Sequence, residues 1–311
     1  MLSIYSYKIS HWIYFKRTYR KVITMSNNNQ TNAAMNTPLE VVKGNIKLQE
    51  NRATMPLGKM ILLGIMAGMF IAGGASASST AMHAIGNVGL ARFVAGAIFP
   101  VGLMMIVFIG GELFTGDCMM IFGVFTKKVK VVDLVRVLIT VWISNLVGSV
   151  IFAYLVYASG QYNYTNGLLG AFTIKVALGK CTIPFGTAFA SGILCNIFVC
   201  GAVLMGSAAK DAGGKVWAIF FPIMAFVVSG YEHCVANMYY IPAGIFAKSN
   251  PAYVQTAMET YGFTEDQIAN LNWGSFFINS SIPVTLGNIV GGMIFISLLL
   301  FLVHKSSLEE K

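Results

Sequence analysis

The chain is predicted to be an all-α integral membrane protein with six transmembrane helices. Only 11% of its 311 residues are charged and 56% are hydrophobic, whereas soluble proteins contain about 25% charged residues. A spanning helix needs about 20 consecutive, mainly apolar residues. Six stretches meet that requirement: residues 58–82, 92–124, 132–158, 184–209, 215–247 and 277–303.

The second and fifth stretches are longer than a single span needs, and both are interrupted. The second contains Gly-Gly-Glu-Leu-Phe-Thr-Gly-Asp at residues 110–117, and the fifth contains Ser-Gly-Tyr-Glu-His at residues 229–233. Non-helical backbone at membrane depth is tolerated only inside protein or along a water-filled cavity. We therefore predict that both are broken helices that face a central path.

An internal repeat supports this arrangement. Residues 64–73 resemble residues 192–201, residues 145–152 resemble residues 288–295, and Phe-Pro pairs stand at residues 99–100 and 221–222. Three spans separate the partners, an odd number, so the halves (residues 57–160 and 180–305) should have opposite topology. Inverted repeats with broken helices place the substrate path near the midplane, between the repeats.

The basic residues predict the orientation. Loops with many Lys and Arg residues stay in the cytoplasm, and one set of loops and flanks is clearly richer in them. On this basis both termini are cytoplasmic in a multi-pass protein of the plasma (inner) membrane. The richer set is Lys43, Lys47, Arg52, Lys59, Lys127, Lys128, Lys130, Arg136, Lys210, Lys215, Lys305 and Lys311, against Arg92, Lys175, Lys180 and Lys248.

The chain divides into a cytoplasmic N-terminal segment (1–56), a transmembrane channel domain (57–305) and a short cytoplasmic tail (306–311). Residues 1–24 are basic and aromatic without the apolar core of a signal peptide. We interpret them as lying upstream of a true start at Met25; a segment lying on the membrane surface is the competing interpretation. A short amphipathic helix is expected around residues 39–48.

Adjacent Glu232 and His233 lie inside the fifth apolar stretch. Ionisable side chains at membrane depth are costly, by about 2.5–3.5 kcal/mol on insertion scales, and usually mark a substrate or ion path. His233 is the only histidine placed within the middle of a span. It therefore predicts a site where protons or anions are handled.

Other chemistry is disfavoured. The five cysteines lack zinc or thioredoxin spacing, so we expect no metal, no cofactor and no structural disulfide. A zinc protease needs His-Glu-x-x-His on one helix, and no second histidine is near His233. An intramembrane enzyme that uses Glu232 and His233 as acid and base is the less favoured alternative, and no nucleotide motif supports ATP-driven pumping.

Four motifs in order resemble the formate/nitrite transporter family. They are Gly-Glu-Leu-Phe-Thr-Gly at 111–116, Asn-Ile-Phe-Val-Cys-Gly at 196–201, Ser-Gly-Tyr-Glu-His at 229–233 with Ala-Asn-Met at 236–238, and Ile-Pro-Val-Thr-Leu-Gly-Asn at 282–288. The resemblance covers residues 40–305. It implies an aquaporin-like six-helix fold, a homopentamer in the lipid bilayer, and passage of formate, nitrite, hydrosulfide, acetate or lactate, or of their neutral acids, through each protomer.

The resemblance also implies roles for individual residues. His233 is the central histidine, Thr115 a pore-facing hydroxyl, Lys180 the vestibule lysine, and Asn196 a residue of the substrate path. Glu232 is expected to form a structural ion pair with Lys59. The hydrophobic constrictions correspond to Phe99, Leu103, Leu113 and Phe226, with Val199 as a further candidate.

Several alternatives stay open at this stage. Thr115 could instead cap the second half of its helix, and Asn196 could either bridge helices or line the path. The residues do not decide whether His233 donates a proton or only holds the substrate. They also do not choose among the anions.

Overall fold

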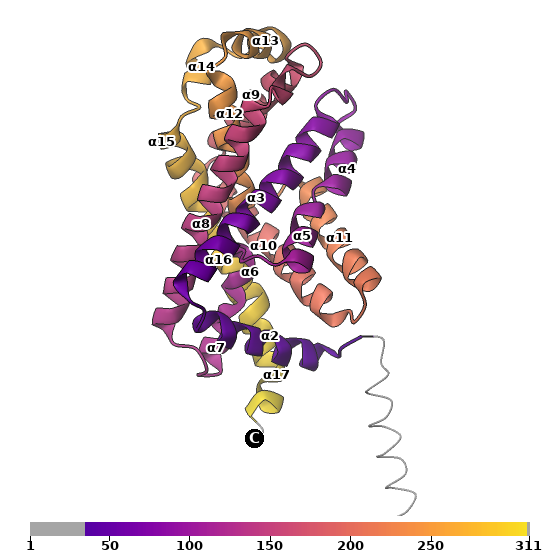
Figure 1. Ribbon diagram of the computed structural model, residues 1–311, viewed down its shortest axis with the longest axis vertical. Helices are drawn as coiled ribbons and strands as arrows, with labels where there is room; N and C mark the ends of the chain where they lie inside the picture. Colours follow the sequence, from indigo (N-terminus) through magenta and orange to yellow (C-terminus); the bar gives the residue numbers. More distant parts are fainter. Residues whose placement is uncertain (1–34, 310–311) are drawn as a thin grey trace, which may run out of the picture.

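The computed structural model describes residues 35–309, and within that range the chain consists of helices joined by loops (Figure 1). The predictions for residues 1–34, including the start at Met25, lie outside the described residues. The α-helices are α2 (Pro38–Ala53), α3 (Leu57–Met82), α4 (Val88–Ile98), α5 (Val101–Ile109), α6 (Phe114–Asp117), α7 (Ile121–Phe125), α8 (Val131–Ala158), α9 (Leu168–Cys181), α10 (Phe185–Ala208), α11 (Ala212–Ser229), α12 (Cys234–Lys248), α13 (Pro251–Tyr261), α14 (Glu265–Ala269), α15 (Trp273–Ser275), α16 (Ile282–Val290) and α17 (Leu299–Glu309).

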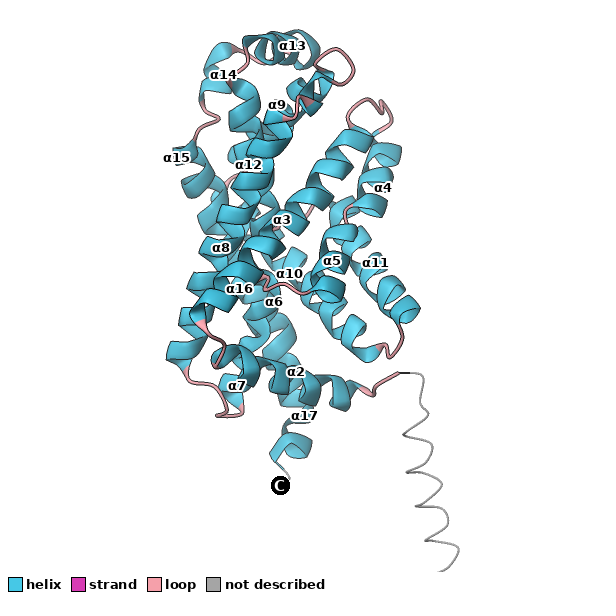
Figure 2. Cartoon of the chain, in the orientation of Figure 1, coloured by secondary structure: helices cyan, strands magenta, loops and turns pink. Residues whose placement is uncertain are grey.

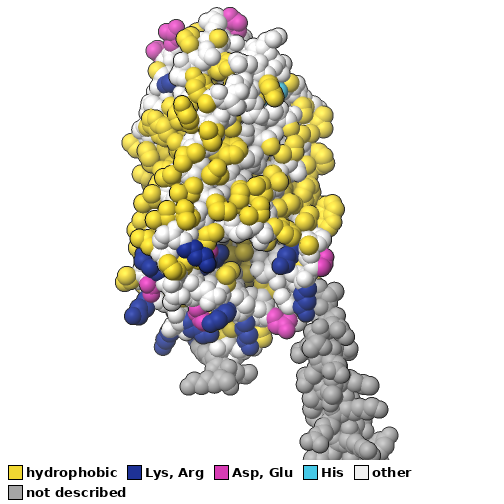
Figure 3. Space-filling view, viewed as in Figure 1, with side chains coloured by type: hydrophobic (Ala, Val, Ile, Leu, Met, Phe, Trp, Pro, Cys, Tyr) yellow, Lys and Arg dark blue, Asp and Glu magenta, His cyan; other side chains and the backbone are white. Residues whose placement is uncertain are grey.

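The six predicted spans are confirmed. Six helical segments among the described residues are long and apolar enough to cross a membrane: Leu57–Met82, Val88–Ile109, Val131–Ala158, Phe185–Ala208, Ala212–Ser229 and Trp273–Leu308. Apolar side chains form a broad band across the face shown in Figure 3, and Lys and Arg side chains gather below it, at the end where α2 and α17 lie. This distribution is typical of a protein that crosses a bilayer.

The second and fifth spans are broken where the sequence predicts. Helix α5 ends at Gly110, whose φ of 108° few side chains could adopt, and α6 begins at Phe114. Helix α11 ends at Gly230 with a φ of 74°, and α12 begins at Cys234. The extended link between α5 and α6 crosses the middle of the molecule (Figure 2). The ends of four half-helices therefore meet at mid-depth.

Two asparagines make equivalent contacts in the two halves. Asn145 accepts a hydrogen bond from the N–H of Phe114 (3.0 Å) and donates to the carbonyls of Gly64 (2.8 Å) and Glu112 (2.9 Å). In the other half, the equivalent contacts are made by Asn288. It accepts from the N–H of Cys234 (2.9 Å) and donates to the carbonyls of Gly192 (2.7 Å) and Glu232 (3.1 Å). Each asparagine therefore fastens a broken span to its neighbouring helices.

The short helix expected near residues 39–48 is present as α2. It begins with a capping box: the Thr37 side chain accepts a hydrogen bond from the backbone N–H of Glu40, and the Glu40 carboxylate accepts one from the backbone N–H of Thr37. Helix α2 packs against α10, α7 and α17 at the Lys- and Arg-rich end (Figure 1). Its last turn brings Arg52 beneath the break in the second span.

The opposite end has a cap that the sequence did not predict. Between α12 and the sixth span, residues 251–275 form α13, α14 and α15, at the top of Figure 1. Helix α9 also lies on this side, packed against α12 and α13. It ends at Cys181, and so places Lys180 beside the break in the fifth span.

Candidate functional site

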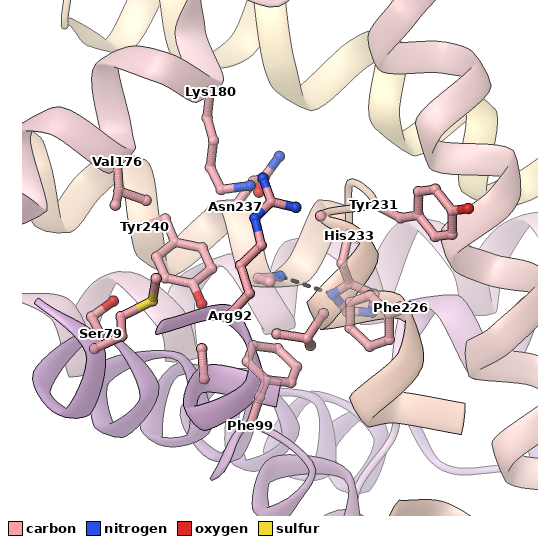
Figure 4. Close-up of a pocket in the computed structure, with 15 residues that line it drawn as sticks. Ser79, Arg92, Phe99, Val176, Lys180, Phe226, Tyr231, His233, Asn237 and Tyr240 are labelled. Atoms are coloured by element: carbon pink, nitrogen blue, oxygen red, sulfur yellow. Dashed lines mark hydrogen bonds between the residues drawn. The ribbon is translucent and has the colours of Figure 1, made fainter. Parts of the chain in front are cut away.

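Two cavities approach the centre from opposite ends. The outer one, on the side of α9 and α13, has a volume of about 190 Å³ and ends at Phe99, Phe226 and His233 (Figure 4). The inner one, on the side of α2, has a volume of about 400 Å³ and ends at Leu103 and Leu113. The site lies between them.

The four expected constriction residues line these cavities, two in each. The rings of Phe99 and Phe226 stand edge to face with centroids 5.6 Å apart, and both are buried. Leu103 and Leu113 are buried at the end of the inner cavity. Val199 is buried too, but it lines neither cavity.

Thr115 and His233 meet between these two apolar pairs. The Oγ1 atom of Thr115 lies 3.0 Å from Nε2 of His233. Both side chains are buried, and they belong to opposite halves of the repeat. Thr115 does not cap its helix, because α6 begins after Leu113 without a side-chain cap.

The backbone determines the tautomer of His233. Its Nδ1 accepts a hydrogen bond from the N–H of Ala236 at 2.9 Å, so the imidazole is the N-cap of α12. An acceptor nitrogen has no proton, so the ring is neutral and its proton is on Nε2. The Nε2–H therefore donates to Thr115. His233 therefore has a structural role as the N-cap of α12, and it also lines the outer cavity.

Asn196 is hydrogen-bonded to the backbone of Thr115. Its side-chain nitrogen donates to the carbonyl of Thr115 (3.1 Å) and to that of Asn288 (2.6 Å), and it is fully buried. Of the two alternatives, the structure favours the helix-bridging one. Its influence on the path comes through the backbone of Thr115.

The expected partner of Glu232 is wrong. Glu232 pairs with Lys180, whose Nζ lies 2.9 and 3.0 Å from the two carboxylate oxygens, and it also accepts from Asn237 at 2.6 Å. Lys59 instead lines the inner cavity, toward the other end of the molecule. The positions of the helices explain this choice. The last turn of α9 places Lys180 beside the break in the fifth span, whereas Lys59 lies in the first turn of α3, at the inner cavity.

A matching ion pair lies at the inner end, and the sequence interpretation missed it. The Nε atom of Arg52 lies 2.6 Å from Glu112, and its Nη1 lies 3.2 Å from Asp117. Burial lowers the pKa of Arg52, but the two carboxylates outweigh it and raise this pKa above its ordinary value. Glu112 occupies the position in its half that Glu232 occupies in the other.

Comparison with known proteins identifies this arrangement. The family model described as "Formate/nitrite transporter" matches residues 39–302. The chain belongs to the formate/nitrite transporter family. A probable formate transporter from Methanothermobacter thermautotrophicus is 38% identical over 285 residues, which cover 86% of this chain and 96% of that one.

Two further relatives support the assignment to the formate/nitrite transporter family. The formate channel FocA from Haemophilus influenzae is 35% identical, over 86% of this chain and 95% of its own. A solved pentameric formate channel with formate bound matches with a TM-score of 0.70 and 34% identity, over 80% of this chain and 98% of that one. Of the residues to which the family resemblance pointed, the fold brings Thr115, His233 and Asn196 together and places Lys59 elsewhere.

One signal could have revealed the inner ion pair of this family member. Glu112 and Glu232 follow the Gly-rich breaks of equivalent spans, and Arg52 and Lys180 precede the first spans of their halves by similar distances. Extending the repeat backwards from residue 64 and from residue 192 pairs these residues. Arg52 and Lys180 carry the same charge but are different amino acids, so a comparison that counts only identical residues does not detect this pair.

Proposed function

We propose that the chain is a transmembrane channel for formate and related small monovalent anions, with residues 57–305 as the channel domain. The observation that supports this most directly is the contact of Thr115 with His233, buried between two cavities and bounded on each side by an apolar pair. Such an arrangement gives a small solute polar partners at one point of an otherwise apolar path. The formate-bound relative supports the choice of solute.

The apolar pairs set the physical problem. A bare carboxylate loses its hydration between Phe99 and Phe226, which costs several kcal/mol or more. Formate is mainly ionised at neutral pH, because carboxyl groups have a pKa near ~4. A low dielectric raises the proton affinity of the anion, so passage as the neutral acid lowers the barrier.

Neutral His233 suits that passage. Its Nε2–H is a hydrogen-bond donor aimed at the path, and the Thr115 hydroxyl can donate as well as accept. A formate oxygen that breaks the bond between His233 and Thr115 can accept hydrogen bonds from both side chains. In this scheme the proton of the acid comes from the solvent of a cavity, and His233 keeps its own.

Nitrite is the second candidate, because the family description names it beside formate. Hydrosulfide, acetate and lactate remain candidates on the same physical argument. The intramembrane enzyme is disfavoured because Glu232, its proposed acid, is bonded to Lys180 and Asn237. A channel requires no catalytic step.

We also propose a homopentamer in the plasma (inner) membrane, with both termini cytoplasmic. The pentameric relative supports the assembly, and the Lys and Arg side chains at the α2 and α17 end support the orientation (Figure 3). Native mass spectrometry of the purified protein should give five copies. Labelling of a cysteine introduced after residue 309 should occur only from the cytoplasmic side.

Transport in vesicles tests the function. Purified protein in liposomes should dissipate a formate gradient without any cofactor, and faster at pH 5.5 than at pH 7.5 if the acid is the form that crosses. Formate, nitrite, hydrosulfide, acetate and lactate should be compared at both pH values. Protein-free liposomes correct for diffusion of the acids through lipid. Formate and nitrite fluxes equal to those of the lipid control would refute the proposal.

A further inference from the structure

The outer cavity contains two cationic side chains, Lys180 and Arg92, and they differ in their partners (Figure 4). The positive charge of Lys180 is balanced by Glu232, with which it makes two contacts. His233 adds no charge, because its Nδ1 is an acceptor. Lys180, Glu232 and His233 together are therefore neutral.

Arg92 enters the cavity from α4. Its Nη1 donates to the carbonyl of Val228 at 3.1 Å, which fixes its position without neutralising its charge. Within residues 35–309 no carboxylate forms an ion pair with it. A guanidinium has several N–H donors, and the Val228 carbonyl is the one acceptor that the described part of the chain offers it. Arg92 therefore provides the uncompensated positive charge of the cavity.

Gly230 provides the space in which the guanidinium lies. A Cβ atom at that position would be only 3.0 Å from Nη1 of Arg92. Arg92 thus reaches from the first half across the turn that ends α11 in the second half. From that turn the chain leads directly to Glu232 and His233. An anion held at Arg92 is at the entrance to the central contact.

We infer that Arg92 captures the anion at the outer mouth and favours planar anions that carry two acceptor oxygens. The inference rests on the proposed function and assigns its entry step. A guanidinium presents parallel N–H groups that match two oxygens of one planar anion, and an ammonium group cannot. Formate and nitrite have that shape, whereas hydrosulfide has one acceptor atom and responds to charge alone.

The test measures initial uptake into liposomes against substrate concentration, at low and at high ionic strength. Arg92→Gln should raise the half-saturating formate concentration about three- to tenfold at low salt, the size of one partly screened unit charge. The maximal rate should stay near that of the wild type. The salt dependence of the half-saturating concentration should diminish, because exposed charges are screened by salt.

Two further variants separate charge, shape and structure. Arg92→Lys keeps the charge, so it should restore hydrosulfide entry fully and formate or nitrite entry only in part. Lys175→Gln is the matched control: it removes a charge from the same side, but Lys175 stacks on Tyr261 and does not line the cavity. It should leave all half-saturating concentrations unchanged.

The outcomes are distinct. If the wild-type protein conducts formate and Arg92→Gln has the same half-saturating concentration and maximal rate at both salt concentrations, this inference is overturned and the proposed function stays intact. A lower maximal rate with unchanged half-saturation also overturns it, because that result indicates a structural role. A wild-type protein that conducts none of the anions overturns the proposed function, and the inference with it.

Discussion

His233 and Leu113 occupy equivalent positions in the two inverted halves. His233 precedes Cys234, whose N–H donates to Asn288, and Leu113 precedes Phe114, whose N–H donates to Asn145 in the same way. The two residues are the N-caps of the second half-helices of their broken spans. A frame that is symmetrical in its backbone bonds therefore presents an imidazole from one side and an aliphatic side chain from the other. The polar centre of the path exists because the symmetry is broken at this position.

Replacing His233 with Asn should preserve transport. An Asn side chain offers an oxygen to the N–H of Ala236, so it keeps the cap of α12, and its amide keeps a neutral N–H donor on the side of Thr115. We expect a formate flux within about threefold of the wild type, the range of one neutral hydrogen bond, and the same pH profile. Liposome uptake between pH 5.5 and 7.5 is the measurement.

A matched variant shows what that bond pattern contributes. His233→Leu copies Leu113 and removes both the cap and the donor. We expect a flux close to the lipid background and a loss of about 1 kcal/mol of stability, typical of a lost N-cap. If His233→Asn instead abolished the pH dependence, the imidazole would itself be exchanging a proton during transport.

Thr115 should act through its hydroxyl. Thr115→Val keeps the shape of the side chain and removes the bond to His233. We expect the flux to fall about three- to tenfold, because one hydrogen bond of net worth near 1 kcal/mol is lost from the crossing state. Thr115→Ser retains the hydroxyl and serves as the control. Equal flux in the Val variant would show that the hydroxyl does not touch the solute.

Lys180 and Glu232 should be coupled in stability. Lys180→Gln leaves Glu232 buried without its cation, and breaking a buried pair costs about 3–5 kcal/mol. The double variant with Glu232→Gln should recover most of that loss, because two amides can bond to each other and to Asn237. Thermal unfolding of the four proteins in detergent gives the coupling free energy. Additive losses would indicate that the two side chains act independently.

The inner cluster should respond differently, because one cation faces two acids. Arg52 faces both Glu112 and Asp117, so Arg52→Gln leaves two buried carboxylates and should be more destabilising than Lys180→Gln. Asp117→Asn removes one of the two acids, and we expect its stability to equal or exceed that of the wild type. Unfolding midpoints across pH 5–8 measure both variants. A strongly destabilised Asp117→Asn protein would mean that both carboxylates are needed to hold α2.

The spans, their breaks and the repeat were predictable from sequence, because each depends on local residue types. Apolar length identifies a span, and glycine beside a buried acid indicates a break at membrane depth. Partner choice was not predictable in that way. Lys59 and Lys180 were both plausible for Glu232 by residue type, and only the inverted packing of α9 against α12 decides between them.

The same limit applies to Arg52, to Arg92 and to the cap at residues 251–275. Their sequence surroundings are ordinary: a polar helix, a glycine-rich helix start and a mixed polar segment. What gives them a role is the contact with a distant element, such as Arg92 with the turn after α11. Contacts of this kind depend on the fold, which the local pattern does not specify.

The closest helix contacts provide the last prediction. At Gly148 on α8, an added Cβ would collide with the carbonyl oxygen of Ile65 on α3, and in the other half Gly291 stands in the same relation to the carbonyl oxygen of Ile193. Backbone atoms cannot rotate away, so Gly148→Ala should cost at least about 1–3 kcal/mol by overpacking. Gly201→Ala on α10 is the control, because no atom lies within 4 Å of its added Cβ. That variant should gain about 0.5–1 kcal/mol from reduced backbone entropy. Unfolding midpoints that fall in the first variant and hold or rise in the second would show that close backbone approach, which small residues allow between membrane helices, holds the two halves in shape.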